Sequence, residues 1–259
     1  MHGADGACFI SPVTMSGRAF RPWQHLHDVQ QFVEAAQAAG VRKVVYHSAL
    51  GAHVKAASRT LRDAAAAEEA VKAGATNAKQ EAKNSLFRYY LARSGLLMGP
   101  ADGFLSALIR SAKTSSPFAG VLGYGSTLVQ PLHVDDFAEC FARFFLERPE
   151  ELEAGRYALA GPEIRTLLQL QDMALLRLGR TKLKYHAPLF VLGALAALSP
   201  RRAPVAGGKS EAVGLRERVS LLFDVFVTEH NDAPRLLGPG ETLFTLKQTQ
   251  EEVLAAAIG

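Results

Sequence analysis

Polar residues that could bind a ligand or move a proton follow two apolar runs of this sequence. The first run, VRKVVYH, ends in His47 and Ser48, and the second, FRYYLARSGLL, carries Arg93, Ser94 and Gly95. A serine hydroxyl placed after a strand can orient a substrate carbonyl, although it can equally satisfy a turn. Open α/β sheets bind their ligands at the carboxyl ends of parallel strands. The two runs therefore predict one site at one end of a sheet, with Ser48 as its catalytic candidate.

The roles of the neighbouring residues have alternatives. His47 is a candidate acid or base, and the competing interpretation is a buried histidine of the core. Arg93 could contact a ligand, or it could anchor a loop. Both alternatives are left open at this point. Ser11 and Pro12 lie near the end of an earlier apolar run, ACFISPV, and we include them in the set that the family resemblance described below implies for cofactor binding. That set comprises Ser11, Pro12, His47, Ser48, Arg93, Ser94 and Gly95.

A second group of polar residues lies in the segment QPLHVDDFAE, Gln130–Glu139. Asp135 and Asp136 could serve as paired carboxylates in acid–base chemistry. However, aspartate directly before an apolar helical run is typical of a helix N-terminus, where it caps amides and favours the helix dipole. We prefer that structural interpretation. Gln130 and His133, together with Met98, are expected on the substrate side of the site.

Composition restricts the class of protein. Hydrophobic residues make up 48% and charged residues 21% of 259 residues, which is typical of a globular chain with a buried core. The net charge of +4 is dispersed, and no run of five Lys or Arg occurs, which argues against a nucleic-acid-binding protein. The two cysteines, Cys8 and Cys140, and the histidines and acids lack metal-ligand spacing, so we expect no metal. Unpaired cysteines indicate a reducing compartment.

The longest apolar stretch, PLFVLGALAAL at 188–198, is shorter than the ~20 residues that a membrane-spanning helix needs. With the following Ser-Pro-Arg-Arg it could make at most peripheral membrane contact through 188–202. The sequence MHGADGACFI lacks the features of a signal peptide. We therefore expect a cytoplasmic protein, or one of the mitochondrial matrix or another organelle in a eukaryote.

Hydrophobic periodicity predicts an alternation of strands and helices in the first part of the chain. A strand at 7–13, a loop at 14–24, a helix at 25–39, a stop at Gly40 and a strand at 41–47 form a βαβ unit with parallel strands. A long helix follows at 57–85, interrupted or extended near Gly74, and then a strand at 87–97. Glu68, Glu69 and Lys72 are expected on the solvated side of that helix.

The alternation is less regular after residue 102. We expect helices at 103–113, 135–147, 163–178, 187–198 and 211–226, strands at 129–134 and 156–160, and a loop at 115–125. These patterns predict a parallel α/β sheet and a smaller, mainly helical C-terminal lobe. Together with the family resemblance given in the next paragraph, they imply that the sheet is an incomplete Rossmann-like sheet and that residues 1–114 form the C-terminal part of a dinucleotide-binding domain. Residues 115–259 would form the substrate-side lobe, interleaved with the last strands of that sheet.

Three segments resemble the extended short-chain dehydrogenase/reductases of the NAD-dependent epimerase/dehydratase superfamily: GVRKVVYHSALG, RSGLLMGPADGFL and QPLHVDDFAE. They are most similar to the atypical, NmrA-like branch that includes the nucleotide-binding accessory subunit of respiratory complex I. This resemblance covers residues 4–160, and the C-terminal HNDAPRLLGPGETLF resembles the tail of that branch more weakly. It implies NAD or NADP as cofactor and a protein complex as a partner.

The sequence departs from this family in two respects. The family holds the pyrophosphate at a glycine-rich turn before a helix. Here the first strand resembles the family's fourth, so the resemblance implies an N-terminally truncated chain that lacks on the order of 80–100 residues. The family's catalytic Tyr and Lys, one helical turn apart, correspond to Thr60 and Ala64. Neither side chain can replace a phenol or an ammonium group in proton transfer.

Three functional hypotheses follow from the resemblance and its departures. The chain could be an oxidoreductase or epimerase-type enzyme, represented here by a fragment. It could be a noncatalytic accessory or assembly subunit, which the loss of Tyr and Lys favours. It could also be a decayed product with no function of its own. For this chain as given we expect NAD(P) binding to be weak or absent.

Overall fold

The computed structural model describes residues 3–10, 22–80, 87–100, 102, 104–146, 152–188, 220–221, 223–224, 226–238 and 241–256. Ser11 and Pro12, the end of the strand expected at 7–13 and most of the helices expected at 187–198 and 211–226 lie outside these residues. No helix in the described part of the chain is long and apolar enough to span a bilayer.

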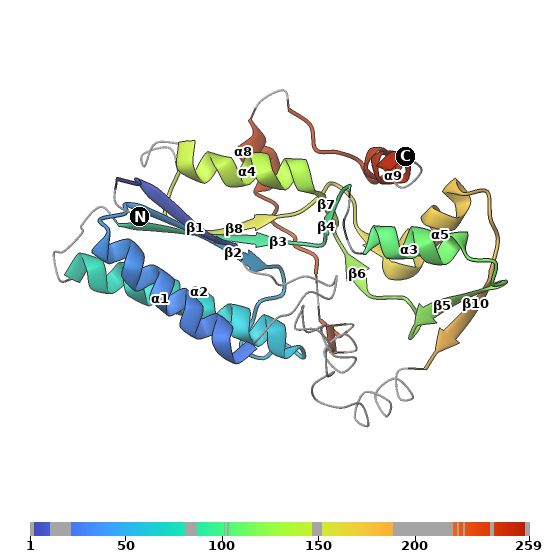
Figure 1. The fold of residues 1–259 in the computed structure, drawn as a ribbon, viewed down its shortest axis with the longest axis horizontal. Helices are drawn as coiled ribbons and strands as arrows, with labels where there is room; N and C mark the ends of the chain where they lie inside the picture. Colours follow the sequence, from blue (N-terminus) through green and yellow to red (C-terminus); the bar gives the residue numbers. More distant parts are fainter. Residues whose placement is uncertain are drawn as a thin grey trace, which may run out of the picture.

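Four parallel strands form the central sheet, in the order β1 (Gly6–Ile10), β2 (Lys43–Ala49), β3 (Arg88–Ser94) and β8 (Gly155–Leu159). Helices lie on both faces of the sheet (Figure 1), so the inner strands are apolar on both sides and β2 is buried along almost its whole length. Ser48 lies opposite Arg93 in the register. The polar residues of β2 and β3 therefore meet at one end of the sheet, and the predicted Rossmann-like class is confirmed.

Two helices that connect the strands pack together on one face of the sheet. These are α1 (Pro22–Ala38) and α2 (Arg59–Gln80). Gly74 lies at their contact, where a Cβ atom would be only 2.4 Å from Cγ1 of Val33. The predicted interruption of α2 near Gly74 is wrong, since the glycine instead permits the close approach of two continuous helices.

The opposite face of the sheet is covered by α4 (Val134–Leu146) and, beyond it, by α8 (Ala233–Leu237) (Figure 1). The apolar side of α4 meets the sheet in a core rich in aromatic rings. The rings of Phe144 and Tyr90 are 5.3 Å apart, and those of Phe144 and Tyr157 are 5.1 Å apart. Burial of such large side chains is the main favourable contribution to folding here.

The outer edge of β8 is closed by side chains rather than by another strand. Asn231 accepts a hydrogen bond from the amide of Ala160 and donates one to its carbonyl, at 3.1 and 2.8 Å. Asp232 accepts from the amide of Ala158 at 2.9 Å, and its own amide donates to the Ala158 carbonyl. These side chains satisfy the backbone groups that an edge strand otherwise exposes.

A second core lies beyond the sheet and joins three helices: α3 (Leu105–Lys113), α5 (Leu167–Arg177) and α9 (Leu246–Ala256). Three short strand pairs connect this region: β4 (Leu97–Met98) with β7 (Leu132–His133), β6 (Leu128–Val129) with β9 (Arg165–Thr166), and β5 (Phe118–Leu122) with β10 (Leu183–Ala187). Met98, expected on the substrate side, is buried in this core. The division at residue 114 stays a prediction.

Three further predictions about local structure are corrected. The loop expected at 115–125 contains β5, whose partner β10 is distant in the sequence. The loop expected at 14–24 ends earlier, because α1 begins at Pro22, and proline is well suited to the first turn of a helix. The strand expected at 129–134 is divided into β6 and β7 around Pro131, which has no amide to donate to a ladder.

Candidate functional site

A buried carboxylate organises the carboxyl ends of β2 and β3. Glu68 of α2 is only 1% exposed, and its Oε1 accepts hydrogen bonds from Ser48 Oγ at 2.6 Å and from Arg93 Nε at 2.7 Å. Its Oε2 accepts from Arg93 Nη2 at 2.7 Å and lies 3.3 Å from Arg156 Nη2. This two-point contact between a guanidinium and a carboxylate is the geometry that makes such pairs strong. The expectation that Glu68 lies on a solvated helix side is wrong, whereas the Glu69–Lys72 pair is at the surface as expected.

Arg93 is an anchor for the surrounding loop as well as a partner of Glu68. Its Nη2 also donates to the carbonyl of Ala52, at 2.9 Å, in the loop that follows β2. Arg93 therefore makes the contacts expected of a loop anchor, and its contact with a ligand stays a prediction. The hydroxyl hydrogen of Ser48 is donated to Glu68. Ser48 would have to give up that bond before it could donate to a substrate carbonyl.

His47 points to the opposite face of the sheet, because neighbouring side chains of a strand alternate. It lies under α4, with its ring 4.7 Å from that of Phe137, and its Nε2 is 2.8 Å from Ser94 Oγ. Burial lowers the pKa of His47 to about 4, so the imidazole is neutral at physiological pH. Its Nδ1 is buried and has no hydrogen-bond partner among the residues that the structure describes. His47 and Ser94 thus form a pair within the core under α4.

Two glycines and Gln130 hold the strand ends close together. A Cβ atom at Gly95 would lie 2.6 Å from the Gln130 carbonyl oxygen, and the Gly95 amide donates to the carbonyl of Leu159 at 3.1 Å. A Cβ atom at Gly161 would lie 1.7 Å from the Pro131 carbonyl oxygen. The Gln130 side chain donates to the Gly161 carbonyl at 2.9 Å and accepts from the Thr228 amide at 3.1 Å. These contacts fix the backbone, as glycine at a close approach usually does.

The two α2 positions that correspond to the family's Tyr and Lys are closed to solvent. Thr60 is buried, and Ala64 is fully buried beside Ala52 and Ala65 in a small alanine cluster. Alanine lacks any group that could bind a ribose or lower the pKa of a neighbour. The structure therefore offers no ammonium group at this point of α2.

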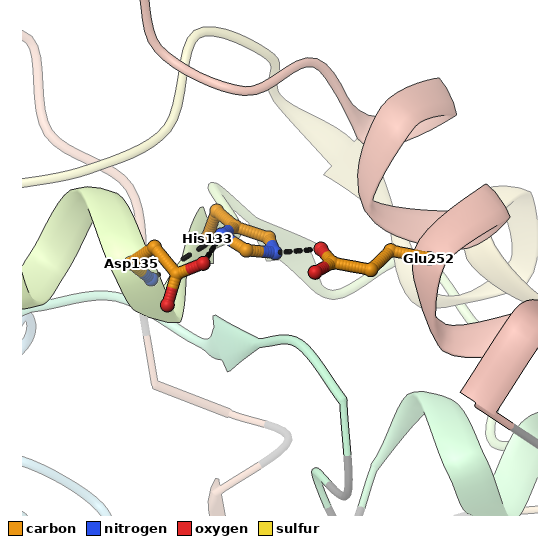
Figure 2. Close-up of side chains that lie close together, drawn as sticks. All are labelled: His133, Asp135 and Glu252. Carbon is orange, nitrogen blue, oxygen red and sulfur yellow. Dashed lines mark hydrogen bonds and ion pairs between the residues drawn. The ribbon is translucent and has the colours of Figure 1, made fainter.

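His133 forms the centre of a cluster with two carboxylates (Figure 2). Its Nε2 lies 2.7 Å from Oε2 of Glu252 on α9, and its Nδ1 lies 3.8 Å from Oδ2 of Asp135 at the start of α4. Phe244 stacks on the imidazole, with the ring centroids 4.3 Å apart. The Asp136 carboxylate accepts the Phe244 amide at 2.8 Å. The C-terminal segment is thereby held over the junction of β7 and α4.

Three ligand atoms of His133, Asp135 and Glu252 lie within 4.8 Å of one another, a grouping that could hold a cation. The hydrogen bonds argue against that use. The Asp135 amide donates to Nδ1 of His133 at 3.2 Å, so the proton of a neutral imidazole lies on Nε2 and is donated to Glu252. The carboxylates face opposite nitrogens of the ring (Figure 2). The cluster is therefore a hydrogen-bonded link, which sequence spacing missed because Glu252 is 119 residues from His133.

Some of the predicted site residues lie close together in the structure, and others do not. His47, Ser48, Arg93, Ser94, Gly95 and Gln130 gather at the carboxyl ends of neighbouring strands, whereas Met98 and His133 lie within the second core and under the C-terminal segment. Ser11 and Pro12 lie outside the described residues. Sequence reasoning missed Glu68, which it placed on the solvated side of the predicted helix together with Glu69. The roles assigned to all these residues stay predictions.

Solved structures share this architecture at low sequence identity. A nucleoside-diphosphate-sugar epimerase from Staphylococcus aureus aligns with a TM-score of 0.69 at 14% identity, over 97% of this chain and 77% of its own. The fold is that of the NAD-dependent epimerases and reductases. A triphenylmethane reductase from Citrobacter sp., solved with NADP(H), aligns with a TM-score of 0.65 at 17% identity over the same shares of the two chains. The UDP-glucuronic acid 4-epimerase of Bacillus cereus, solved with NAD, has a TM-score of 0.61 at 13% identity, over 90% of this chain and 66% of its own.

One curated protein is similar in sequence. Subunit 9 of the NADH dehydrogenase [ubiquinone] 1 alpha subcomplex, a mitochondrial protein of Arabidopsis thaliana, is 30% identical over 139 residues, which is 54% of this chain. The match spans 31% of that relative, about a third of its length. No family model matches the chain.

The described residues at the strand ends fit a nicotinamide dinucleotide poorly. Ser48 and Arg93 direct their donors to Glu68, and the Gly95 amide is bonded within the sheet. A dinucleotide needs a cluster of free backbone amides for its pyrophosphate and donors for its ribose hydroxyls. At this end of the sheet the site residues form bonds to each other instead.

Proposed function

We propose that this chain is a noncatalytic protein with the NAD-dependent epimerase and reductase fold, and that it binds nicotinamide dinucleotides weakly or not at all. One observation carries the proposal. Glu68 takes the donors of Ser48 and Arg93, the two residues best placed to serve a ligand at the ends of β2 and β3. The fold indicates the structural class of the protein, and the buried Glu68 cluster supports a structural rather than a catalytic role for its strand-end residues.

Among the described residues at the strand ends, we find no group well suited to the proton transfer that such a reaction needs. Hydride transfer to or from a carbonyl carbon is accompanied by proton transfer at its oxygen, and the acid or base must reach that oxygen. Thr60 is a much weaker acid than a phenol, and Ala64 provides no charge to lower a pKa. His47, the remaining candidate, is neutral and bonded to Ser94 in the core. The proposal therefore expects no turnover.

Titration with NADH and NADPH, followed by nicotinamide fluorescence and calorimetry, tests the binding half of the proposal. We expect a Kd weaker than about 1 mM for either nucleotide, equivalent to less than about 4 kcal/mol of binding free energy. Micromolar, stoichiometric binding would overturn it. The Thr60→Tyr/Ala64→Lys double variant is the matched enzyme-like control, because it restores the two missing groups.

An assay of NAD-linked oxidation of UDP-sugars, followed by the absorbance of the reduced nicotinamide, tests the proposal that the chain is noncatalytic. The wild-type chain should show no turnover. Turnover in the wild type refutes the proposal. Turnover confined to the double variant supports it, because it locates the defect at Thr60 and Ala64. Circular dichroism should accompany the assay, since the Lys at position 64 must find a path out of a fully buried site.

A second candidate function is an accessory subunit of a respiratory NADH:quinone oxidoreductase-like complex. Two observations favour it: the similarity to subunit 9 of the plant mitochondrial enzyme, and an apolar surface on the β5–β10 pair. Phe118 and Leu183 are opposite each other in the register and are 57% and 66% exposed, and Tyr185 on the same face is 64% exposed. Adjacent exposed apolar side chains of this kind are typical of protein contacts.

Native electrophoresis of detergent-solubilised membranes from the source organism tests this candidate. The tagged protein should comigrate with NADH:quinone oxidoreductase activity. The Leu183→Ser/Tyr185→Ser variant should lose that comigration, whereas the Leu176→Ser control, at another exposed leucine, should keep it. Migration of the wild-type protein apart from the activity would exclude an accessory role.

A further inference from the structure

The β5–β10 pair has one packed face and one exposed face, and it lies at an end of the molecule away from the central sheet (Figure 1). On the packed face, Ala119 and Val121 of β5 are almost fully buried. Because the side chains of a strand alternate, Phe118 of β5 and Leu183 and Tyr185 of β10 share the other face, where each is more than half exposed. We call these three side chains the apolar face.

The chain around the apolar face is basic. Residues 103–134, which contain β5, include two Lys or Arg and no Asp or Glu. Residues 173–188, which contain β10, include four Lys or Arg and no Asp or Glu. These two stretches are distant in the sequence, and the pairing of β5 with β10 brings them together. The structure thus gathers positive charge that looks dispersed along the chain.

Two of these basic residues, Arg180 and Lys182, are held at the carboxyl end of α3. Both donate to the Thr114 carbonyl, at 3.1 and 3.0 Å. Within the described part of the chain, the contacts of these two cations end on backbone carbonyls or on the Thr114 hydroxyl, and none ends on a carboxylate. Lys184 and Arg177 pair with acidic side chains and contribute less to the local charge. Arg180 and Lys182 therefore place fixed positive charge beside the apolar face.

We infer that the apolar face binds the surface of an anionic lipid bilayer, with Phe118, Leu183 and Tyr185 in the boundary between headgroups and acyl chains. Aromatic and leucine side chains are favourable at this depth, and Tyr185 can keep its hydroxyl in water. Lys182 directly precedes Leu183, so their Cα atoms are about 3.8 Å apart. Its charge thus lies within the screening length of about 10 Å at 0.1 M salt and attracts anionic headgroups.

The chemistry of the apolar face favours a bilayer over a protein as its occupant. Phe118, Leu183 and the intervening Gly120 have no side-chain hydrogen-bonding group, and Tyr185 has one hydroxyl. A protein interface usually carries about one hydrogen bond per 100–200 Å², whereas insertion into the acyl boundary requires none. This lipid contact does not depend on the noncatalytic role proposed above. A protein contact at the same face is the alternative outcome of the test.

Cosedimentation of the purified full chain with lipid vesicles tests the inference. The protein should pellet with vesicles of phosphatidylcholine that contain about 30% phosphatidylserine. Binding to vesicles of phosphatidylcholine alone should be about tenfold weaker or more, and raising the salt from about 0.1 to about 0.5 M should weaken the anionic binding. A wild-type protein that stays in the supernatant overturns the inference. Equal binding to the two kinds of vesicle overturns it as well.

Substitutions test whether the apolar face makes the contact. Leu183→Ser/Tyr185→Ser should weaken binding to anionic vesicles about tenfold or more. Leu146→Ser, at a leucine that is 74% exposed at the end of α4, is the matched control and should bind as the wild type does. Circular dichroism establishes that each variant is folded. Unchanged binding of the double variant would place the contact elsewhere, such as in residues 188–202, and would overturn the inference.

Two further results separate lipid from protein. The chain has one tryptophan, Trp23. In Trp23→Phe/Tyr185→Trp, anionic vesicles should shift the fluorescence to shorter wavelength, because the indole at position 185 leaves water; pelleting without that shift overturns the inference. Comigration with oxidoreductase activity that depends on Leu183 and Tyr185, in a protein that does not bind vesicles, would show that a protein covers the face and would also overturn it.

Discussion

Replacing Glu68 by alanine should destabilise the protein more than any other single removal of a charged side chain at the strand ends. The carboxylate is 1% exposed and binds Ser48, Arg93 and Arg156. Alanine would leave the Arg93 guanidinium, 18% exposed, without its counter-charge. It would also leave the buried Ser48 hydroxyl without its acceptor. The α2–sheet contact would then carry an uncompensated charge.

The magnitude follows from the burial of the partners. Removing one member of a buried ion pair costs about 3–5 kcal/mol, because the other charge stays desolvated. Arg93 can reach some water through its exposed fraction, and the half-exposed Arg156 contributes little. We therefore expect a loss of about 3 kcal/mol in the free energy of unfolding. For a chain of this size that corresponds to a fall in Tm of about 6–12 °C.

Urea denaturation and thermal melting, both followed by circular dichroism, measure this loss. Glu69→Ala is the matched control, because Glu69 is the next residue along the helix and pairs with Lys72 at the surface, so its removal should cost about 0.5 kcal/mol or less. In Glu68→Met/Arg93→Met both charges are absent, and much of the stability should return. Equal losses in Glu68→Ala and Glu69→Ala would refute the argument that the cluster is buried and coupled.

Two further predictions concern other parts of the same sheet. Burial lowers the pKa of His47 and His25 to about 4, below the unfolded value of 6.5. The unfolded chain therefore binds more protons, and stability should fall as pH decreases from about 6.5 to 4. The His47→Phe/Ser94→Ala variant should flatten that pH dependence in urea titrations, and an unchanged slope would contradict the prediction. Gly161→Ala should cost about 1–3 kcal/mol because its Cβ would meet the Pro131 carbonyl, whereas Gly155→Ala, with open space around it, should change stability by about 0.5 kcal/mol or less in the same assay.

The fold could be predicted from the sequence where local pattern and tertiary structure agree. The β-branched run before His47 and the helical periodicity before Gly40 each specify one element, and together they specify a parallel pair. The β5–β10 pair could not be found in this way, because its strands are more than 60 residues apart and β5 lies between Pro117 and Gly123, in a segment typical of a loop. Pairing over such a distance leaves no periodic signal.

The site was predictable in position and less so in its contacts. Parallel strands must bring Ser48 and Arg93 to the same end of the sheet, and they do so in register. Which donor meets which acceptor depends on the rotation of α2, which decides whether Glu68 or Glu69 faces inward. Both residues are acidic, so composition does not distinguish them. The link between His133 and Glu252 depends on the docking of α9, which the local sequence does not encode.

The closure of β8 by Asn231 and Asp232 has a consequence for synthesis. Ala158 and Ala160 precede their partners by 74 and 71 residues. At the usual ribosomal rate of roughly 5–20 residues per second, Asn231 and Asp232 are therefore synthesised about 4–15 s after β8. During that interval the nascent chain exposes unpaired backbone groups along β8, which a chaperone can shield or a neighbouring polypeptide can bind. The backbone groups of Ala158 and Ala160 thus reach their native partners only after the tail has been synthesised.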